Sequence, residues 1–300
     1  MRPPAAPEAE PRLATGAAEA GAARPQRARS RLSATGRVGL TLVIFWILIA
    51  LLGPWLVTHR PGAVVSTEVF ASMSLRFPLG TDYLGRDMLS RILIGARYTV
   101  GLALAAALAA SLAGTVLGLL AAISKRWVDE VVSRTLDALI CIPSKIFALV
   151  MVAAFGSSVP FLLLTAALSY TPGAFRISRS LAVDLSVMDY VQAARVRGER
   201  QLHIACIEIL PNMINPMLAD FGLRFMFIVL LLSGLSFLGL GVQPPAADLG
   251  SLIRENISGL GEGAPAVILP AIAVATLTIG VNLMIDALPG HARAKGGGEA

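Results

Sequence analysis

The stretch "VGLALAAALAASLAGTVLGLLAAI" at Val100–Ile123 decides the class of this protein. An α-helix needs roughly 20 consecutive apolar residues to cross the ~30 Å hydrocarbon core of a bilayer. This run reaches that length without a single Asp, Glu, Lys or Arg, and several other runs in the chain come close to it. The sequence therefore predicts an all-α, polytopic membrane protein.

The composition points the same way. Charged side chains make up 15% of the 300 residues, against roughly 25% in soluble domains. The formal net charge of +6 would suggest nucleic acid in a soluble chain, but in a membrane chain excess arginine is typical of cytoplasmic loops. We therefore expect a lipid membrane around the chain and no nucleic-acid partner. The two cysteines, Cys141 and Cys206, indicate no disulfide framework.

Apolar runs along the chain predict about six transmembrane helices. They lie at about Val38–Val57, Val100–Ile123, Leu136–Phe155, Phe161–Ile177, Met213–Leu240 and Ala266–Leu288. The segment 1–37 is too poor in large apolar side chains to fold and should be a disordered tail. We expect a first transmembrane helix plus external loop at 38–99, a core of five transmembrane helices at 100–288 that includes a cytoplasmic loop at 189–211, and a second tail at 289–300.

Arginine placement predicts the orientation. Five arginines cluster shortly before the first span, at Arg24, Arg27, Arg29, Arg31 and Arg37, and such a cluster favours the cytoplasmic side. No small-residue cleavage pattern follows this span, so we interpret it as an uncleaved anchor. An even number of spans then leaves both termini in the cytoplasm. The loop 58–99 is also rich in arginine and opposes this orientation, although its acidic residues weaken the objection.

A charged segment, "DYVQAARVRGERQLHIACIEILPN", interrupts the apolar chain at Asp189–Asn212. One helical face holds residues at i, i+3, i+4 and i+7, namely Tyr190, Ala193, Ala194 and Arg197. The two alanines make this face thin enough for a partner to approach closely. Gly198 then allows a turn at a position where other residues would be strained.

A second short helix should follow that turn, at about Arg200–Leu210. Pro211 is expected to end it, with Leu210 biased to an extended conformation. The predicted product is a helix–turn–helix along the cytoplasmic membrane surface. From the spacing alone, an ordinary solvated loop with an amphipathic helix at the interface stays an open alternative.

Three stretches together resemble the permease subunits of ABC importers. "YVQAARVRG…ILPN" is similar to their EAA motif, a coupling helix that docks into a groove of the cytoplasmic ATPase. "FPLGTDYLGRDMLSRILIGARYTV" (Phe77–Val100) and "LSFLGLGVQPPAADLG" (Leu235–Gly250) resemble the dipeptide/oligopeptide/nickel branch, its second permease in particular. The similarity runs from about residue 38 to 288. Two positions depart from the motif, because Asp189 replaces the usual glutamate and Arg197 stands where a small or apolar residue is commoner.

The resemblance implies a type I ABC-importer permease fold in a bacterial inner (plasma) membrane. It implies an ATPase-docking loop that contains Asp189, Gln192, Ala193, Ala194, Arg197, Gly198, Leu210 and Pro211. The implied partners are a homologous second permease, two cytoplasmic ABC ATPases, and a periplasmic or extracellular solute-binding protein. ATP and Mg²⁺ would bind to the ATPases, and this chain would need no cofactor. Peptides, nickel or its chelates, opines and glycosides all stay open as solutes.

The external loop motif "GTDYLGRD" is a further candidate site. It offers two glycines for turns and three charged residues for a local tie: Gly80, Asp82, Gly85, Arg86 and Asp87. We favour a structural brace at the outer face, with contact to the solute-binding protein as the alternative.

Two residue pairs within the predicted spans are also candidates. Asp220 and Arg224 stand four apart, so they can pair on one helix face. We expect this pair to line the cytoplasmic half of the translocation pathway or the seam with the second permease, and a purely structural salt bridge is the alternative. Gly114 and Gly118 form a small-xxx-small pair, which we expect to contact the second permease.

Enzyme classes find little support. The three histidines, His59, His203 and His291, fall in separate loops, without metal-ligand or Ser/His/Asp spacing. None of the three lysines follows a glycine-rich loop of the kind that holds ATP phosphates. We therefore expect no catalytic and no metal-binding residues. The alternative function is an ion-coupled secondary transporter, with which Asp220 and Asp286 are weakly compatible.

Overall fold

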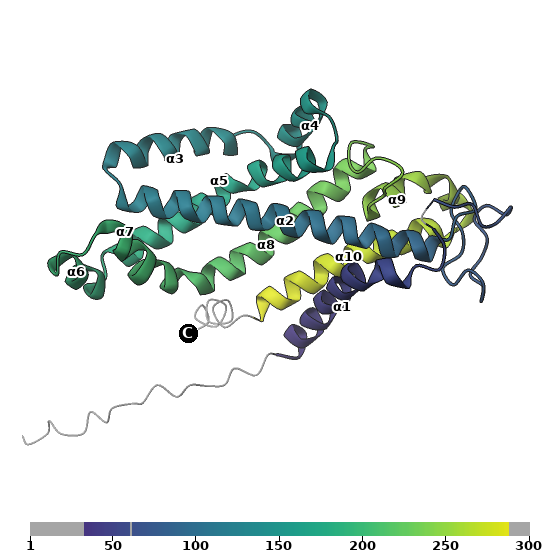
Figure 1. The fold of residues 1–300 in the computed structure, drawn as a ribbon, viewed down its shortest axis with the longest axis horizontal. Coiled ribbons are helices and arrows are strands. Elements are labelled where there is room, and N and C mark those ends of the chain that lie inside the picture. The colour runs from purple at the N-terminus through teal and green to yellow at the C-terminus, as the bar shows by residue number, and fades with distance from the viewer. Residues whose placement is uncertain (1–32, 61, 288–300) are drawn as a thin grey trace, which may run out of the picture. The chain divides into compact units, whose positions relative to one another are not determined.

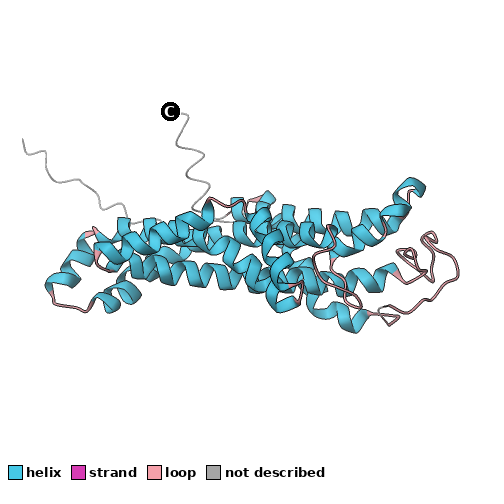
Figure 2. Cartoon of the chain, turned by 90° about the horizontal axis from the view of Figure 1, so that it is seen from above, coloured by secondary structure: helices cyan, strands magenta, loops and turns pink. Residues whose placement is uncertain are grey.

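The computed structural model describes residues 33–60 and 62–287, which belong to one compact unit. These residues form helices and loops, with isolated bridges at Val64–Arg86 and Thr81–Asp87 in place of any strand (Figure 2). The predicted all-α class is confirmed. The helices are α1 (Ala34–Leu56), α2 (Met88–Ile123), α3 (Arg126–Ile140), α4 (Ser144–Phe155), α5 (Val159–Ser186), α6 (Asp189–Val196), α7 (Gln201–His203), a π-helical stretch (Ile204–Ile209), α8 (Leu210–Phe237), α9 (Leu249–Glu255), a 3₁₀ helix (Ile257–Glu262) and α10 (Pro265–Asp286).

Four helices in the described residues are long and apolar enough to cross a membrane. They are Ala34–Leu56, Met88–Ile123, Gln201–Phe237 and Pro265–Asp286. Helices α3 and α4 together would make a fifth span, broken by a bend of 86°. The predicted span at 161–177 lies inside the 28-residue helix α5, which is not among these candidates. Length and composition therefore support four or five of the six predicted spans.

The third predicted span, Leu136–Phe155, is not one continuous helix. Helix α3 ends at Ile140, and Pro143 caps α4, because the residue before a proline is disfavoured in the helical conformation. Helix α3 also begins earlier than the apolar run, at Arg126. Two ion pairs hold it against α5, between Arg179 and Asp129 and between Arg176 and Asp137. A count of apolar residues could not detect a helix held in this way.

Several other boundaries differ from the prediction. Helix α2 begins at Met88, so residues 88–99 of the expected external loop are helical, because polar side chains such as Ser90 and Arg91 are buried there. Helix α1 begins at Ala34, inside the segment predicted as a tail. Residues 1–32 of the first tail and the whole tail at 289–300 lie outside the described residues.

Helix α2 packs against α5, α1 and α8 (Figure 1). The middle of its buried stripe is rich in residues with small or absent side chains: Ala103, Ala106, Ala107, Ala110, Gly114 and Gly118. A Cβ atom at Gly114 would lie 2.7 Å from the backbone nitrogen of Phe175, and one at Gly118 would lie 2.8 Å from that of Arg179. The prediction that these glycines contact a second permease is therefore wrong, because they face α5 of the same chain.

Helices α1 and α10 form a second close pair (Figure 1). A Cβ atom at Gly39 would lie 2.7 Å from the carbonyl oxygen of Gly280, so the two backbones nearly touch. The indole Nε1 of Trp46 donates a hydrogen bond to Thr276 Oγ1 across this contact, at 3.1 Å. The first and last described helices are thus held to each other by contacts made far apart in the sequence.

We predict that Gly118→Leu destabilises the fold of the chain, because the new side chain would displace backbone atoms of α5. Overpacking of this kind costs about 1–3 kcal/mol or more. Gly101→Leu is the matched control, since Gly101 lies on the same helix with open space around it. The measurement is the thermal unfolding temperature in detergent. Equal unfolding temperatures for the two variants would contradict the close α2–α5 contact.

Candidate functional site

The charged segment folds as a compact helix–turn–helix at the end of the molecule where α2 ends and α8 begins (Figure 1). Helix α6 covers Asp189–Val196, and Gly198 follows with φ +79°. The N–H of Glu199 donates back to the carbonyl of Ala194 at 3.2 Å, which closes the turn. A positive φ is costly for residues with a Cβ atom, so glycine is the residue that this turn requires.

The second helix of the segment does not end at Pro211. Residues 201–237 form one helix, and Leu210 is helical, with φ −54° and ψ −45°, so its predicted extended conformation is wrong. The ring of a proline clashes with the carbonyl four residues earlier. Here the π-helical stretch Ile204–Ile209 directly precedes Pro211, and such a widened turn accommodates the clash.

The two alanines of α6 have different surroundings. Ala194 is fully buried, with Val191 beside it, against Ile204, Ile209 and Met213 of the following helix. The thin helical face therefore serves, in part, close packing within the chain itself. Ala193 is exposed, as are Asp189 and Gln192.

Two apolar side chains at the tip of this segment were missed by the sequence analysis. Val196 is 88% exposed and Leu202 is 61% exposed, on either side of the turn. Val196 stands between two arginines, so no periodic pattern marked it, and helical spacing alone gave Leu202 no role in a contact. Apolar side chains presented on such a tip suit contact with a groove in another protein.

Arg197 braces the turn. Its Nη2 lies 2.7 Å from Glu199 Oε1 and 3.8 Å from Glu208 Oε1, on the second helix. His203 Nε2 is 3.7 Å from the other oxygen of Glu199. The arginine at this position thus ties α6 to the following helix, which accounts for its presence where a small residue is commoner.

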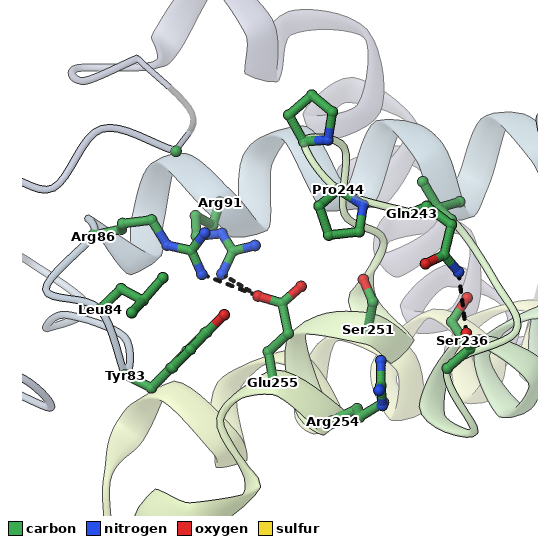
Figure 3. Close-up of a pocket in the computed structure, with 14 residues that line it drawn as sticks. Tyr83, Leu84, Arg86, Arg91, Ser236, Gln243, Pro244, Ser251, Arg254 and Glu255 are labelled. Carbon is green, nitrogen blue, oxygen red and sulfur yellow. Dashed lines mark hydrogen bonds and ion pairs between the residues drawn. The ribbon is translucent and has the colours of Figure 1, made fainter.

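The opposite end of the molecule carries a charged cluster centred on Asp82. This side chain is fully buried, and its Oδ2 accepts hydrogen bonds from Arg86 Nε at 2.6 Å and Arg91 Nη1 at 2.7 Å. Glu255 Oε2 of α9 accepts from both arginines, at 3.0 and 2.8 Å (Figure 3). Burial lowers the pKa of the Arg86 guanidinium, but the carboxylates of Asp82 and Glu255 outweigh burial and raise its pKa.

Of the three charged residues predicted to interact in the external loop, Asp82 and Arg86 form an ion pair. Asp87 does not join this pair. Asp87 accepts a hydrogen bond from the N–H of Ser90 at 3.2 Å and so caps α2. Gly80 and Gly85 both have positive φ, at +75° and +73°, as expected for turns. The sequence analysis missed Arg91 and Glu255, because Glu255 is 164 residues from Arg91 and no local pattern connects them.

Asp220 and Arg224 form a buried pair on α8. Arg224 Nε and Nη2 donate to the two carboxylate oxygens of Asp220 at 2.6 and 3.0 Å. Arg224 Nη1 donates to the carbonyl of Tyr170 on α5 at 2.7 Å. Gly173 leaves room for this guanidinium, since a Cβ atom there would lie 2.9 Å from Nη1. The pair links α8 to α5, a geometry that favours the structural alternative.

Comparison with known proteins now becomes decisive. Residues 114–293 match the family described as binding-protein-dependent transport system inner membrane component. The chain belongs to this family. A di/tripeptide transport system permease protein of Pseudomonas aeruginosa is 30% identical over 256 residues, which cover 83% of this chain and 84% of that protein.

Two further relatives are similar over much of their length. A dipeptide transport system permease protein of Alkalihalophilus pseudofirmus is 30% identical over 251 residues, 84% of this chain and 83% of that protein. A glutathione transport system permease protein of Pectobacterium atrosepticum is 32% identical over 210 residues, 70% of each chain.

This inner membrane component is therefore the permease subunit of an ABC importer and a multi-pass membrane protein. It is not an enzyme, because the hydrolysis of ATP in such importers belongs to separate subunits. Family membership sets aside the alternative of an ion-coupled secondary transporter.

We predict that Asp82→Asn loosens the outer end of this permease. The substitution places an amide between two guanidinium groups and leaves the cluster with uncompensated positive charge, at a cost of about 3 kcal/mol. Limited trypsin digestion should cut the segment 57–87 faster than in the unmodified chain. Glu68→Gln is the matched control, since the exposed Glu68 side chain has no ion pair among those found in the described residues. Equal digestion rates for the two variants would contradict the brace.

The pair on α8 gives a second prediction. Asp220→Ala should lower the thermal stability of the permease more than the double variant Asp220→Ala with Arg224→Leu, because the single change leaves a buried arginine without its acid. The expected difference is about 2 kcal/mol or more. If both variants keep the stability of the unmodified protein and lose transport, the charges face the solute and the structural role is wrong.

Proposed function

We propose that this permease carries short peptides across the inner membrane. The relatives named above are permeases of di/tripeptide, dipeptide and glutathione transport systems. Glutathione is itself a tripeptide, so the three names share one chemical class of solute. The proposal includes a homologous second permease that completes the translocation pathway with this chain.

The docking segment is continuous with a spanning helix, and this continuity supports the proposed mechanism. Residues 201–237 form one helix, and α6 packs onto its start through buried contacts of Val191 and Ala194. A force applied to α6 is therefore transmitted to α8 without an intervening flexible loop. Such a rigid connection suits a segment that converts closure of an ATPase into movement of the spans.

We infer that one of two cytoplasmic ABC ATPases docks on this segment, and that the two ATPases bind the ATP and Mg²⁺ that drive transport. Asp189, Gln192, Ala193, Val196 and Leu202 supply an exposed surface of mixed character for this contact. Arg197 and Gly198 hold the turn, whereas Leu210 and Pro211 belong to the helix behind it. The segment then lies in the cytoplasm, together with both termini, in agreement with the arginines that precede α1.

The second permease is proposed to cover an apolar groove between α2 and α8. This groove has a volume of about 280 Å³ and is lined by Leu108, Leu112, Ile214, Leu218 and Phe221, among others. The alternation between inward- and outward-facing states would be a population shift, to which each partner contributes by its different affinity for the two states. A periplasmic or extracellular solute-binding protein delivers the peptide at the opposite end.

The test is Gly198→Val in the assembled importer. A β-branched residue at φ +79° is strained by about 1–2 kcal/mol or more, so we expect loss of peptide-stimulated ATP hydrolysis and of uptake into vesicles, with membrane insertion unchanged. Gly198→Asn is the matched control, because asparagine tolerates the left-handed conformation, and it should retain most activity. Normal uptake by the valine variant would contradict the coupling role of this turn.

A further inference from the structure

A pocket of about 610 Å³ lies at the end of the permease opposite the coupling segment. Its walls come from the loop between α1 and α2, the end of α8, the following loop and α9 (Figure 3). Helix α8 has 28 residues, which correspond to roughly 40 Å at 1.5 Å per residue. The pocket and the ATPase-docking segment therefore lie near opposite ends of the same spanning helix.

The pocket contains a cation without an acidic partner. Arg86 and Arg91 line it, and both are paired with Glu255. Arg254 also lines it, but forms no ion pair or side-chain hydrogen bond among those found in the described residues. Its sequence neighbour Glu255 is already engaged by the other two arginines. The lining therefore carries an excess of positive charge that Arg254 supplies.

The side chain of Arg254 is exposed, and its guanidinium lies against the backbone. It packs against Gly239, where a Cβ atom would lie 2.8 Å from Arg254 Cζ and 3.1 Å from each terminal nitrogen. Gly239 has φ +86°, and Gln243 Nε2 fixes this turn by donating to the carbonyls of Gly239 and Gly241 at 3.1 and 2.9 Å. The guanidinium group therefore lies against Gly239, which has no side chain in the way. Its nitrogens form no hydrogen bond among those found in the described residues, so these donors are available to a ligand.

Several apolar side chains are exposed on elements next to the pocket. The loop between α1 and α2 and the 3₁₀ helix after α9 present Val64, Val69, Leu75, Leu84, Ile257 and Leu260. Exposed apolar side chains outside the spanning helices suit contact with another protein. A filled pocket surrounded by weaker contacts that exclude water is the usual anatomy of an energetically dominant contact between proteins.

We propose that this pocket receives an acidic side chain of the solute-binding protein, whose carboxylate pairs with Arg254. The inference rests on the proposed function, because it assumes a binding protein at this end. A carboxylate matches the planar donors of an arginine and can accept two of them at once. The apolar side chains on the neighbouring loops favour a protein as the source of the carboxylate over the terminal carboxylate of a free peptide.

The experiment measures binding of the cognate solute-binding protein to the complete importer in lipid nanodiscs. Arg254→Gln should weaken this binding roughly tenfold and reduce its dependence on salt concentration. Arg60→Gln is the matched control. It removes one positive charge from an exposed residue of the loop between α1 and α2, outside the pocket, and should change the affinity much less. Each Asp and Glu on the docking face of the binding protein is then replaced by its amide. One of these replacements should lose its effect when Arg254→Gln is also present.

The results of this experiment distinguish failure of the pocket proposal from failure of the proposed function. If the unmodified importer binds the solute-binding protein and Arg254→Gln binds it equally well, the pocket proposal is wrong and the proposed function stands. If the unmodified importer binds no such protein, the proposed function itself fails. Binding of trialanine to the importer alone, lost on its C-terminal amidation and in Arg254→Gln, would assign the carboxylate to the solute and overturn the proposal.

Discussion

Close contact between helix backbones is the constraint on which this structure depends. In a bilayer, apolar side chains gain little by exchanging contact with lipid for contact with one another. Helices therefore associate through close packing and a few polar contacts. Gly114 and Gly118 let α2 approach α5, and Gly39 and Gly280 do the same for α1 and α10. With larger side chains at these four positions, neither helix pair could form, and the buried stripe of α2 would lose its partner.

Polar interactions complement this packing at defined places. The charged cluster around Asp82 holds the loop between α1 and α2 to α9, and the ion pairs of Asp129 and Asp137 hold α3 to α5. Within the spanning part of α8, Arg224 satisfies its donors with Asp220 and a backbone carbonyl. These contacts join neighbouring elements toward the two ends of the molecule, and α8 is one of the helices that connect those ends.

Much of the architecture could be predicted from local sequence, because the length of an apolar run and the spacing of small residues are local properties. The turn at Gly198 and the proximity of Asp82 to Arg86 belong to this class. Features that depend on tertiary contact could not be predicted. The direction in which Ala194 faces, the ion pairs that hold α3, and the addition of Glu255 to the Asp82 cluster all require knowledge of which helices are neighbours.

The π-helical stretch at Ile204–Ile209 lies between the docking helix and the regular part of the spanning helix. An α-helix turns by about 100° for each residue, and a π-helical turn accommodates one residue more than an α-helical turn. Removing a single residue from this stretch would restore regular α-helix and leave the direction in which α6 faces almost unchanged, because the wider turn completes the same rotation with one residue more. The same deletion in a regular α-helical part of residues 201–237 would instead turn α6 by about 100° relative to the rest of that helix.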